Sequence, residues 1–334
     1  MTALGSQAFY DATLPAEFVL PETVTEIGIY AFAEVDLPAG FEIPPLVTEI
    51  ADGTFSQATF PSSFSIPDSI TTIGYNAFFR TNIALAALPS SLTSIGDSAF
   101  SECLQLTGAL VIPATVTSIG ERVFESSDGI TGLTLSDGVA GLEDWAFSGM
   151  TGLETLHIEG DLDIPAYGFM NCSALTTLDI SAGAEVSFGI RAFSGIAATS
   201  LDFSGVNVSS VGSKAFYSAP NLVSIDFGDS NGGVSMTVEN QDFVSSSSLA
   251  SITFPAELSS IGNTIFANTS DPDLVFYSAT PPSTTVADLF TDFPAGGTIY
   301  VPNDSLASYQ AASRWDDYVD NYDGFDPATD PLVP

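Results

Sequence analysis

One apolar position recurs along most of the chain at a nearly constant spacing. It is occupied by phenylalanine, often directly after alanine, and successive members lie 22 to 27 residues apart. These anchor phenylalanines are Phe9, Phe32, Phe55, Phe78, Phe100, Phe124, Phe147, Phe169, Phe193, Phe216, Phe243 and Phe266. A repeat of this length cannot bury its few apolar side chains alone, so neighbouring repeats must stack. The pattern predicts a predominantly β solenoid of about 12 coils of about 22–24 residues.

Two further blocks in each repeat predict short strands. One block reads apolar-Pro-x-x-Val/Ile-Thr-x-Ile-Gly, as in Leu20–Gly28 and Ile112–Gly120. The other alternates apolar and polar residues, as in Leu153–Ile158 and Leu175–Ile180, which is typical of a half-buried strand. Glycine ends the first block at a turn. The Ala-Phe segment is too short for a full helix, and we expect it to form a single helical turn.

This combination of blocks resembles the BspA-type leucine-rich repeat, whose repeats read Leu-x-x-Ile-x-Ile-Pro-x-x-Val-x-x-Ile-Gly-x-x-Ala-Phe-x-x-Cys. The resemblance covers roughly residues 4–270. It implies a right-handed solenoid with short parallel strands. Residues 298–315 are similar to the strand-plus-helix cap that closes such arrays. We therefore expect a solenoid over residues 1–270, a C-terminal capping segment over 271–325, and a linker or tail over 326–334.

The resemblance also implies a class of function. Members of this family are associated with adhesion and with the recognition of host or partner molecules. We therefore expect a non-catalytic extracellular or cell-surface module that recognises a protein or glycan through an extended strand face. The repeated positions are core positions, so the resemblance transfers no binding residues. A structural spacer or stalk in a larger surface protein is the second interpretation.

The charge of the chain excludes several other partners. Its 334 residues carry 5 Lys and Arg against 41 Asp and Glu, a formal net charge of −36. Such a chain repels nucleic-acid phosphates and anionic lipid headgroups. Hydrophobic residues make up 45% of the chain, which is more than acidic disordered chains contain. No apolar run reaches the roughly 18 residues of a membrane span. We expect a folded, strongly acidic protein that acts as a monomer.

The ends of the chain resemble interior sequence. The first five residues lack the charged and apolar regions of a signal peptide, and Gln7-Ala8-Phe9 already matches the repeat. We therefore expect further natural sequence before Met1. The last nine residues are typical of a linker, and we expect them to lead into further sequence too.

The two cysteines occupy equivalent positions in repeats three apart. Cys103 follows Phe100 by three residues, and Cys172 follows Phe169 by three. Coils stacked at about 4.8 Å would separate them by roughly 14 Å. A disulfide requires Cα atoms within about 7 Å, so we expect two buried free thiols.

The sequence offers little for catalysis. Its one histidine, His157, lies in a predicted strand and faces outward between two core positions. Any Ser-His-Asp or Cys-His site would have to use it. Two cysteines cannot supply the four ligands of a cysteine-rich zinc site, and no phosphate-binding loop or nucleophile elbow occurs. We expect no enzyme activity and no cofactor.

Aligning the alternating blocks brings four residues to one outward position in successive coils: His157, Asp179, Asp202 and Asp226. Like charges on neighbouring strands repel, unless salt, a cation or a cationic partner offsets the repulsion. We therefore predict a ligand-binding surface at these four residues. If a divalent cation binds, the three aspartates would be its ligands, and Ca²⁺ suits such oxygen-only ligands. The alternative is a solvated face whose charge keeps the protein soluble.

A threonine recurs in the other strand block of five consecutive repeats: Thr25, Thr48, Thr71, Thr93 and Thr117. A structural ladder of hydroxyl groups accounts for this column. A flat threonine array on a solenoid is also typical of ice-binding proteins. The residues that follow these threonines vary, which argues against an ice-binding face; they are Glu26, Glu49, Thr72, Ser94 and Ser118.

Overall fold

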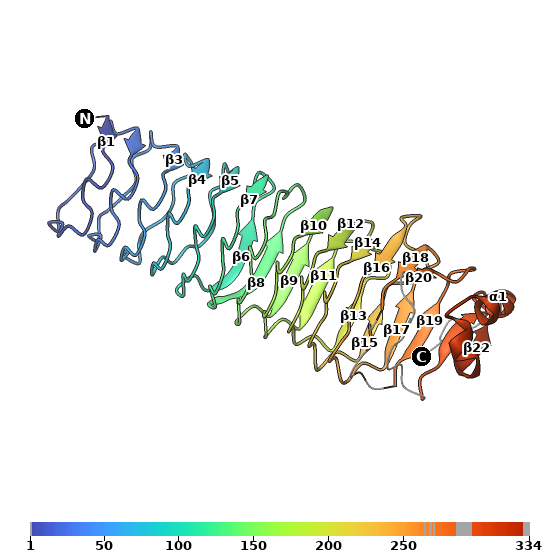
Figure 1. Cartoon of the computed structure of the whole chain (residues 1–334). Helices are drawn as coiled ribbons and strands as arrows, with labels where there is room; N and C mark the ends of the chain where they lie inside the picture. The colour runs from blue at the N-terminus through green and yellow to red at the C-terminus, as the bar shows by residue number, and fades with distance from the viewer. Residues whose placement is uncertain (1, 264, 267–268, 270, 285–295, 330–334) are drawn as a thin grey trace. The chain divides into compact units, whose positions relative to one another are not determined.

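A computed structural model describes residues 2–263, 265–266, 269, 271–284 and 296–329. The chain forms two compact units. Unit 1 comprises Met1–Gly160 and Tyr167–Leu175, and unit 2 comprises Asp161–Ala166 and Thr176–Pro334. In each unit the chain winds into stacked coils whose short strands pair in parallel (Figure 1). The predicted parallel β solenoid is therefore confirmed.

The first strand series of unit 1 comes from the Thr-x-Ile-Gly blocks. Its two-residue strands are β1 (Ala3–Leu4), β2 (Glu26–Ile27), β3 (Glu49–Ile50), β4 (Thr72–Ile73), β5 (Ser94–Ile95) and β7 (Ser118–Ile119). In each strand the second residue is apolar and buried, while the first faces outward. Strand β1 pairs with β2, and β3, β4, β5 and β7 form one parallel sheet.

The second strand series of unit 1 comes from the alternating blocks. It contains β6 (Gly108–Ile112), β8 (Ile130–Leu135) and β9 (Thr155–Ile158), and β8 pairs with both of the others. Buried and outward residues alternate along β9, so Leu156 and Ile158 enter the core on either side of His157. This alternation confirms the strand predicted over this block.

Unit 2 carries the same two series, and most strands of the first series are longer there than in unit 1. One six-stranded sheet contains β10 (Leu162–Ile164), β12 (Glu185–Phe188), β14 (Asn207–Val211), β16 (Met236–Val238), β18 (Leu258–Ile261) and β20 (Ser283–Thr284). The other contains β13 (Ser200–Asp202), β15 (Ser224–Asp226), β17 (Ser251–Phe254), β19 (Asp273–Phe276), β21 (Ile299–Pro302) and β22 (Tyr322–Phe325). Strand β11 (Thr177–Ile180) precedes β13 in the chain.

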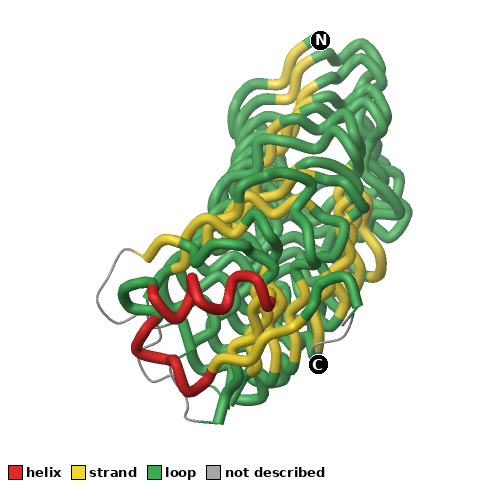
Figure 2. Tube along the Cα trace, turned by 90° about the vertical axis from the view of Figure 1, so that its right-hand side faces the viewer, coloured by secondary structure: helices red, strands yellow, loops and turns green. Residues whose placement is uncertain are grey.

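Helical segments cover the last described coils of unit 2. They are η1 (Asn303–Ser305), α1 (Leu306–Ala311) and η2 (Asp316–Asn321), and Figure 2 shows them beside the final strands. Trp315 is buried with its ring 5.3 Å from that of Phe276, and its indole N–H donates to the Pro282 carbonyl. The cap predicted over residues 298–315 thus contains the strand β21 and the helix α1. The helix ends at Ala311, before the end of the predicted segment, because Ala312 has an extended backbone conformation. No helix in the described part of the chain combines the length and apolar character of a membrane span.

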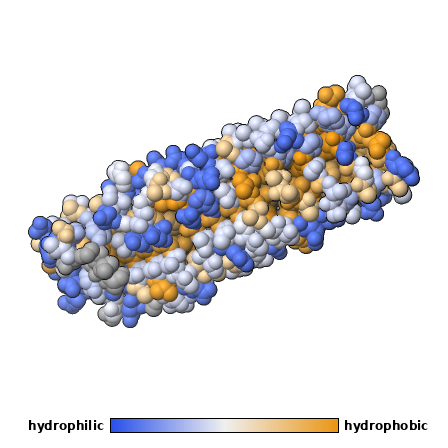
Figure 3. Space-filling view, turned by 180° about the vertical axis from the view of Figure 1, so that it is seen from behind, coloured by the Kyte–Doolittle hydropathy of each residue, from blue (hydrophilic) through white to orange (hydrophobic). Residues whose placement is uncertain are grey.

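The anchor phenylalanines form the centre of each core. In unit 1 the rings of Phe100 and Phe124 stack at 5.2 Å, and those of Phe124 and Phe147 at 5.6 Å. In unit 2 the rings of Phe193 and Phe216 stack at 5.8 Å. These five side chains are completely buried, and each contributes roughly 1.5–3 kcal/mol through removal of apolar surface from water. On the face shown in Figure 3, apolar residues lie interspersed among hydrophilic ones.

The segment around each anchor phenylalanine differs from the single helical turn that we expected. Around the anchor phenylalanines from Phe9 to Phe243, the residues two places before and two places after have positive φ, as Arg122 and Ser126 do at 56° around Phe124. A right-handed helical turn cannot contain such residues. Instead, N–H groups donate alternately within the turn and to the next coil: Glu125 donates to Arg122, and Phe124 to Ala146. We call the residues two places before the anchor phenylalanines the turn column.

Candidate functional site

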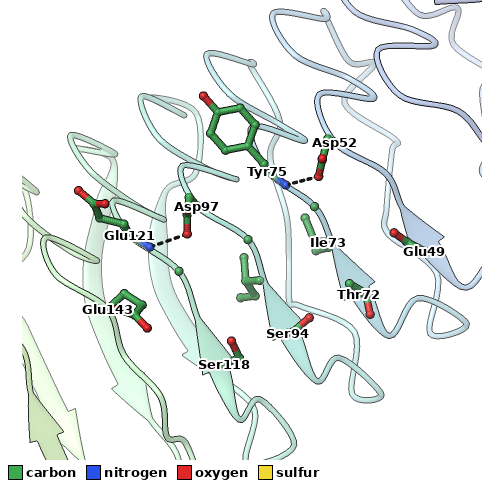
Figure 4. A pocket seen from close by; sticks show the side chains of 14 residues that line it. Glu49, Asp52, Thr72, Ile73, Tyr75, Ser94, Asp97, Ser118, Glu121 and Glu143 are labelled. Atoms are coloured by element: carbon green, nitrogen blue, oxygen red, sulfur yellow. Dashed lines mark hydrogen bonds between the residues drawn. The ribbon is translucent and has the colours of Figure 1, made fainter. Parts of the chain in front are cut away.

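A hollow of about 520 Å³ lies along the outward face of β3, β4, β5 and β7 in unit 1. Five carboxylate side chains line it, and we call this surface the acidic groove: Glu49, Asp52, Asp97, Glu121 and Glu143. Figure 4 shows Glu49 and Asp52 on the coil of β3, while Asp97, Glu121 and Glu143 lie on three coils further along the groove. The hydroxyl side chains of Thr72, Ser94 and Ser118 lie on β4, β5 and β7. The strand-end turns therefore gather negative charge and hydroxyl groups along one open surface.

The glycines of the Ile-Gly turns form the floor of the groove. A Cβ atom on Gly96 would lie 2.8 Å from the carbonyl carbon of Gly74, and one on Gly120 would lie 2.6 Å from the backbone nitrogen of Asp97. Real Cβ contacts are not this short, so a side chain here would push the coils apart. The recurring glycine thus sets how closely successive coils approach.

Two groove carboxylates bind backbone groups of the next coil. The Asp52 carboxylate accepts the N–H of Tyr75 at 2.8 Å, and the Asp97 carboxylate accepts the N–H of Glu121 at 2.9 Å (Figure 4). Because these bonds tie one coil to the next, Asp52 and Asp97 have a structural role. Glu121 contacts the guanidinium group of Arg122, which balances one of the remaining negative charges.

One row of outward side chains crosses four adjacent strands inside the groove. Parallel pairing of β3, β4, β5 and β7 aligns Glu49, Thr72, Ser94 and Ser118. Among the described residues, these four side chains have no hydrogen-bond or ion-pair partner. Strand spacing places such neighbours about 4.8 Å apart. A regularly spaced row of oxygen atoms is therefore available to an extended ligand.

The sequence carried a signal for this row. Its residues directly follow the recurring threonines, so each repeat places one of them at the same outward strand position. The threonines themselves have a structural role: the hydroxyl group of Thr71 donates to the Thr48 carbonyl at 3.2 Å, and that of Thr93 donates to the Thr71 carbonyl at 3.0 Å. Since these hydroxyl groups donate their protons to the neighbouring coil, they cannot donate them to ice, and the ice-binding interpretation is not favoured.

The four residues predicted as a ligand surface divide between the two units. His157 belongs to unit 1, where it lies opposite Thr134 on β8 and its Nε2 is 4.0 Å from a carboxylate oxygen of Glu159. Asp179, Asp202 and Asp226 belong to unit 2.

Asp202 and Asp226 lie directly opposite each other on β13 and β15, as the alignment predicted. Asp179 is exposed on β11. Two of these carboxylates also close turns, because Asp202 accepts the N–H of Ser204 at 2.9 Å and Asp226 accepts the N–H of Gly228 at 2.8 Å. These bonds give both aspartates a local structural role, and ligand binding by them stays a prediction.

The described residues contain no group of three or more His, Cys, Asp or Glu side chains placed to hold a metal ion. Asp179, Asp202 and Asp226 are therefore not gathered around one point, and calcium binding by them stays a prediction. The two cysteines are buried free thiols, as predicted. Burial raises the pKa of Cys103 to about 11 and that of Cys172 to about 12, so both thiols stay protonated at neutral pH.

One solved structure, with a TM-score above 0.5, supports the fold. The chain is similar to a leucine-rich repeat protein from Bacteroides ovatus, at 20% identity and a TM-score of 0.58, over 85% of this chain and 76% of that one. It is also similar to a leucine-rich cell surface protein from Faecalibacterium prausnitzii, at 19% identity and a TM-score of 0.39, over 84% and 83%. The pneumococcal vaccine antigen PcpA matches at 16% identity and a TM-score of 0.40, over 97% and 90%.

Comparison at the level of sequence identifies the family. No curated protein matches the chain. The profile of the BspA type leucine rich repeat region matches residues 1–107, 105–204 and 162–280. These matches span most of the chain and contain every anchor phenylalanine. The chain therefore belongs to the BspA-type leucine-rich repeat family.

Proposed function

We propose that this protein is a non-catalytic recognition module that binds a protein or glycan through the extended strand face of unit 1. The observation that carries the proposal is the aligned row of Glu49, Thr72, Ser94 and Ser118, whose side chains have no partner among the described residues. An extracellular or cell-surface location is part of the proposal and is in keeping with the family. Adhesion is the process that such a module would serve.

The chemistry of the groove favours an extended partner that presents cationic groups. Glu49 and Glu143 lie among the residues that line it, and among the described residues neither carboxylate has an ion-pair partner. A lysine or arginine side chain would pair with such carboxylates, and polar groups between them would bond to the hydroxyl row. The net charge of −36 would also attract a basic partner and accelerate its association.

The proposal is tested on arrays of glycans and matrix proteins at physiological salt, with calcium and again with EDTA. We expect saturable binding to a defined ligand. The double substitution Glu49→Gln/Glu143→Gln should weaken that binding about tenfold, which corresponds to roughly 1.4 kcal/mol. The matched control is Glu17→Gln/Glu22→Gln, which removes the same charge from exposed positions of unit 1 outside the groove. Equal losses in both variants would contradict a site at the groove.

A spacer or stalk is the second candidate. The spacer interpretation is favoured by the hydrogen bonds of Asp52, Asp97 and the threonine hydroxyl groups. These bonds join successive coils, so the polar atoms that form them are not available to a ligand. A spacer has no ligand of its own, so it would leave the arrays blank under both conditions. A blank result would therefore favour the spacer over the recognition module.

A further inference from the structure

Positive charge is scarce in this chain, and its placement is uneven. The five cationic residues are Arg80, Arg122, Arg191, Lys214 and Arg314. In unit 1, Arg80 forms an ion pair with Glu102 at 2.8 Å, and Arg122 contacts Glu121 and Glu125. In unit 2, Arg191 and Lys214 have no carboxylate within 4.0 Å among the described residues. Two of five cations thus lack an anionic partner in a chain with 41 acidic residues.

These two cations are neighbours on successive coils. Both belong to the turn column, with φ of 53° for Arg191 and 63° for Lys214. The Arg191 N–H donates to the carbonyl of Ser213, the residue before Lys214, at 3.1 Å. Like charges on adjacent coils repel each other, so placing Arg191 beside Lys214 destabilises the folded protein when no anion lies between them.

Both cations contact the same aromatic ring. The guanidinium carbon of Arg191 lies 5.4 Å from the ring centre of Tyr217, and the ammonium nitrogen of Lys214 lies 6.0 Å from it. Cation–π attraction of this kind holds the two side chains in place and offsets part of their repulsion. All three side chains are half-buried, so they remain accessible from solvent.

The backbone beneath the cluster is rigidly bonded. The Lys214 N–H donates to Asn240, the Ser218 N–H to Val244, and the Gly195 N–H to Tyr217. These N–H groups are therefore not free to cradle an anion. Recognition at this point would depend on the side chains, in contrast to the backbone nests that capture peptide carboxyl termini.

We propose that Arg191, Lys214 and Tyr217 form a binding site for the single carboxylate or sulfate group of an acidic sugar. Arginine binds such groups through two parallel hydrogen bonds, and lysine adds a point charge. The overall charge of −36 repels a polyanion but tolerates one isolated charge on an otherwise neutral glycan. The site lies in unit 2, whereas the acidic groove lies in unit 1, so the two proposals are independent.

The site is tested by calorimetric titration with three probes: sialyllactose, which carries a carboxylate, sulfated lactose, and neutral lactose. We expect at least one acidic sugar to bind saturably, more weakly as salt is raised, and lactose not to bind. The double substitution Arg191→Gln/Lys214→Gln should reduce the affinity at least about tenfold, as expected when charged hydrogen bonds are lost. Tyr217→Ser should weaken binding too, because the ring that positions both cations is removed.

Arg80→Gln is the control, since it removes a cation that already pairs with the carboxylate of Glu102. It should leave sugar binding unchanged. Thermal unfolding checks that each variant folds. The proposal is overturned if neither acidic sugar binds, if lactose binds equally well, if Arg80→Gln loses binding to the same extent, or if an oligoglutamate peptide binds more tightly than the sugars.

Discussion

The backbone N–H of Ala215 donates a hydrogen bond to the carboxyl group of Asp242, 3.3 Å away on the next coil of unit 2. Asp242 is fully buried directly before the anchor Phe243, where the neighbouring coil has Ala215 before Phe216. Its other carboxyl oxygen has no hydrogen-bond partner among the described residues. Burial raises the pKa of Asp242 well above its usual range, and the charge of Glu239 raises it further. The core therefore favours the neutral acid.

The pH dependence of stability follows from this raised pKa. Below the ordinary aspartate pKa of about 4, both the folded and the unfolded chain hold the proton. As pH rises above it, the unfolded chain ionises first, so Asp242 destabilises the folded state increasingly until its folded pKa is reached. Asp242→Ala should stabilise the protein by roughly 1–3 kcal/mol at neutral pH, and this gain should shrink toward pH of about 4.

Denaturant unfolding of both proteins across this pH range measures the effect. The exposed Asp229→Ala is the control, and its stability should follow that of the wild type. A gain from Asp242→Ala that is independent of pH would contradict the titration of a buried carboxyl group.

The glycine of the Ile-Gly turn should be the most sensitive position of the acidic groove. Gly120→Ala places a Cβ atom 2.6 Å from the backbone nitrogen of Asp97, so the two coils must separate. We expect a loss of roughly 1–3 kcal/mol, the usual cost of overpacking. Gly40→Ala is the control, since a Cβ there meets nothing within 4 Å. Similar unfolding free energies for the two variants would show that coil spacing does not depend on this glycine.

The two thiols should be unreactive in the folded protein. Cys103 donates to the Phe78 carbonyl at 2.9 Å, and Cys172 donates to the Phe147 carbonyl at 3.3 Å. Because burial raises both pKa values and excludes reagents, a thiol-reactive chromophore should label neither cysteine at neutral pH and both in denaturant. Rapid labelling of the native protein would mean that the unit 1 core opens locally.

The aspartates of unit 2 give a test of the predicted ligand surface. Replacing Asp179, Asp202 and Asp226 together with asparagine removes three charges and leaves an amide oxygen to accept the turn N–H groups of Ser204 and Gly228. The fold should therefore persist, and any binding of a cation or cationic ligand to this surface should weaken. Thermal unfolding and binding assays with and without calcium measure the two effects. Unchanged binding would assign these aspartates to turn formation and solubility alone.

Much of the architecture was predictable from local pattern. The spacing of the anchor phenylalanines indicated the solenoid and the size of its coils, and alternation indicated strands such as β9. The equivalent positions of Cys103 and Cys172 predicted two buried free thiols. These inferences succeed because every repeat must bury the same few side chains against its neighbours.

The turn conformations were not predictable in the same way. Arg122 and Trp145 adopt positive φ although this costs a residue with a Cβ atom about 1 kcal/mol or more. Nothing in their side chains favours that conformation. It is imposed by hydrogen bonds to the next coil, such as the bond from Phe124 to Ala146, which no single repeat contains.

The sequence by itself determined the repeat, its buried positions and the excess of negative charge, because these depend on residue type and spacing along one chain. The tertiary structure decided which outward residues meet. Strand register alone aligns Glu49 with Thr72, and coil stacking alone brings Arg191 and Lys214 to one tyrosine ring and buries Asp242 without a full set of partners. The reason is physical: residues about 23 positions apart become neighbours only when successive coils stack, and the hydrogen bonds between coils fix the register.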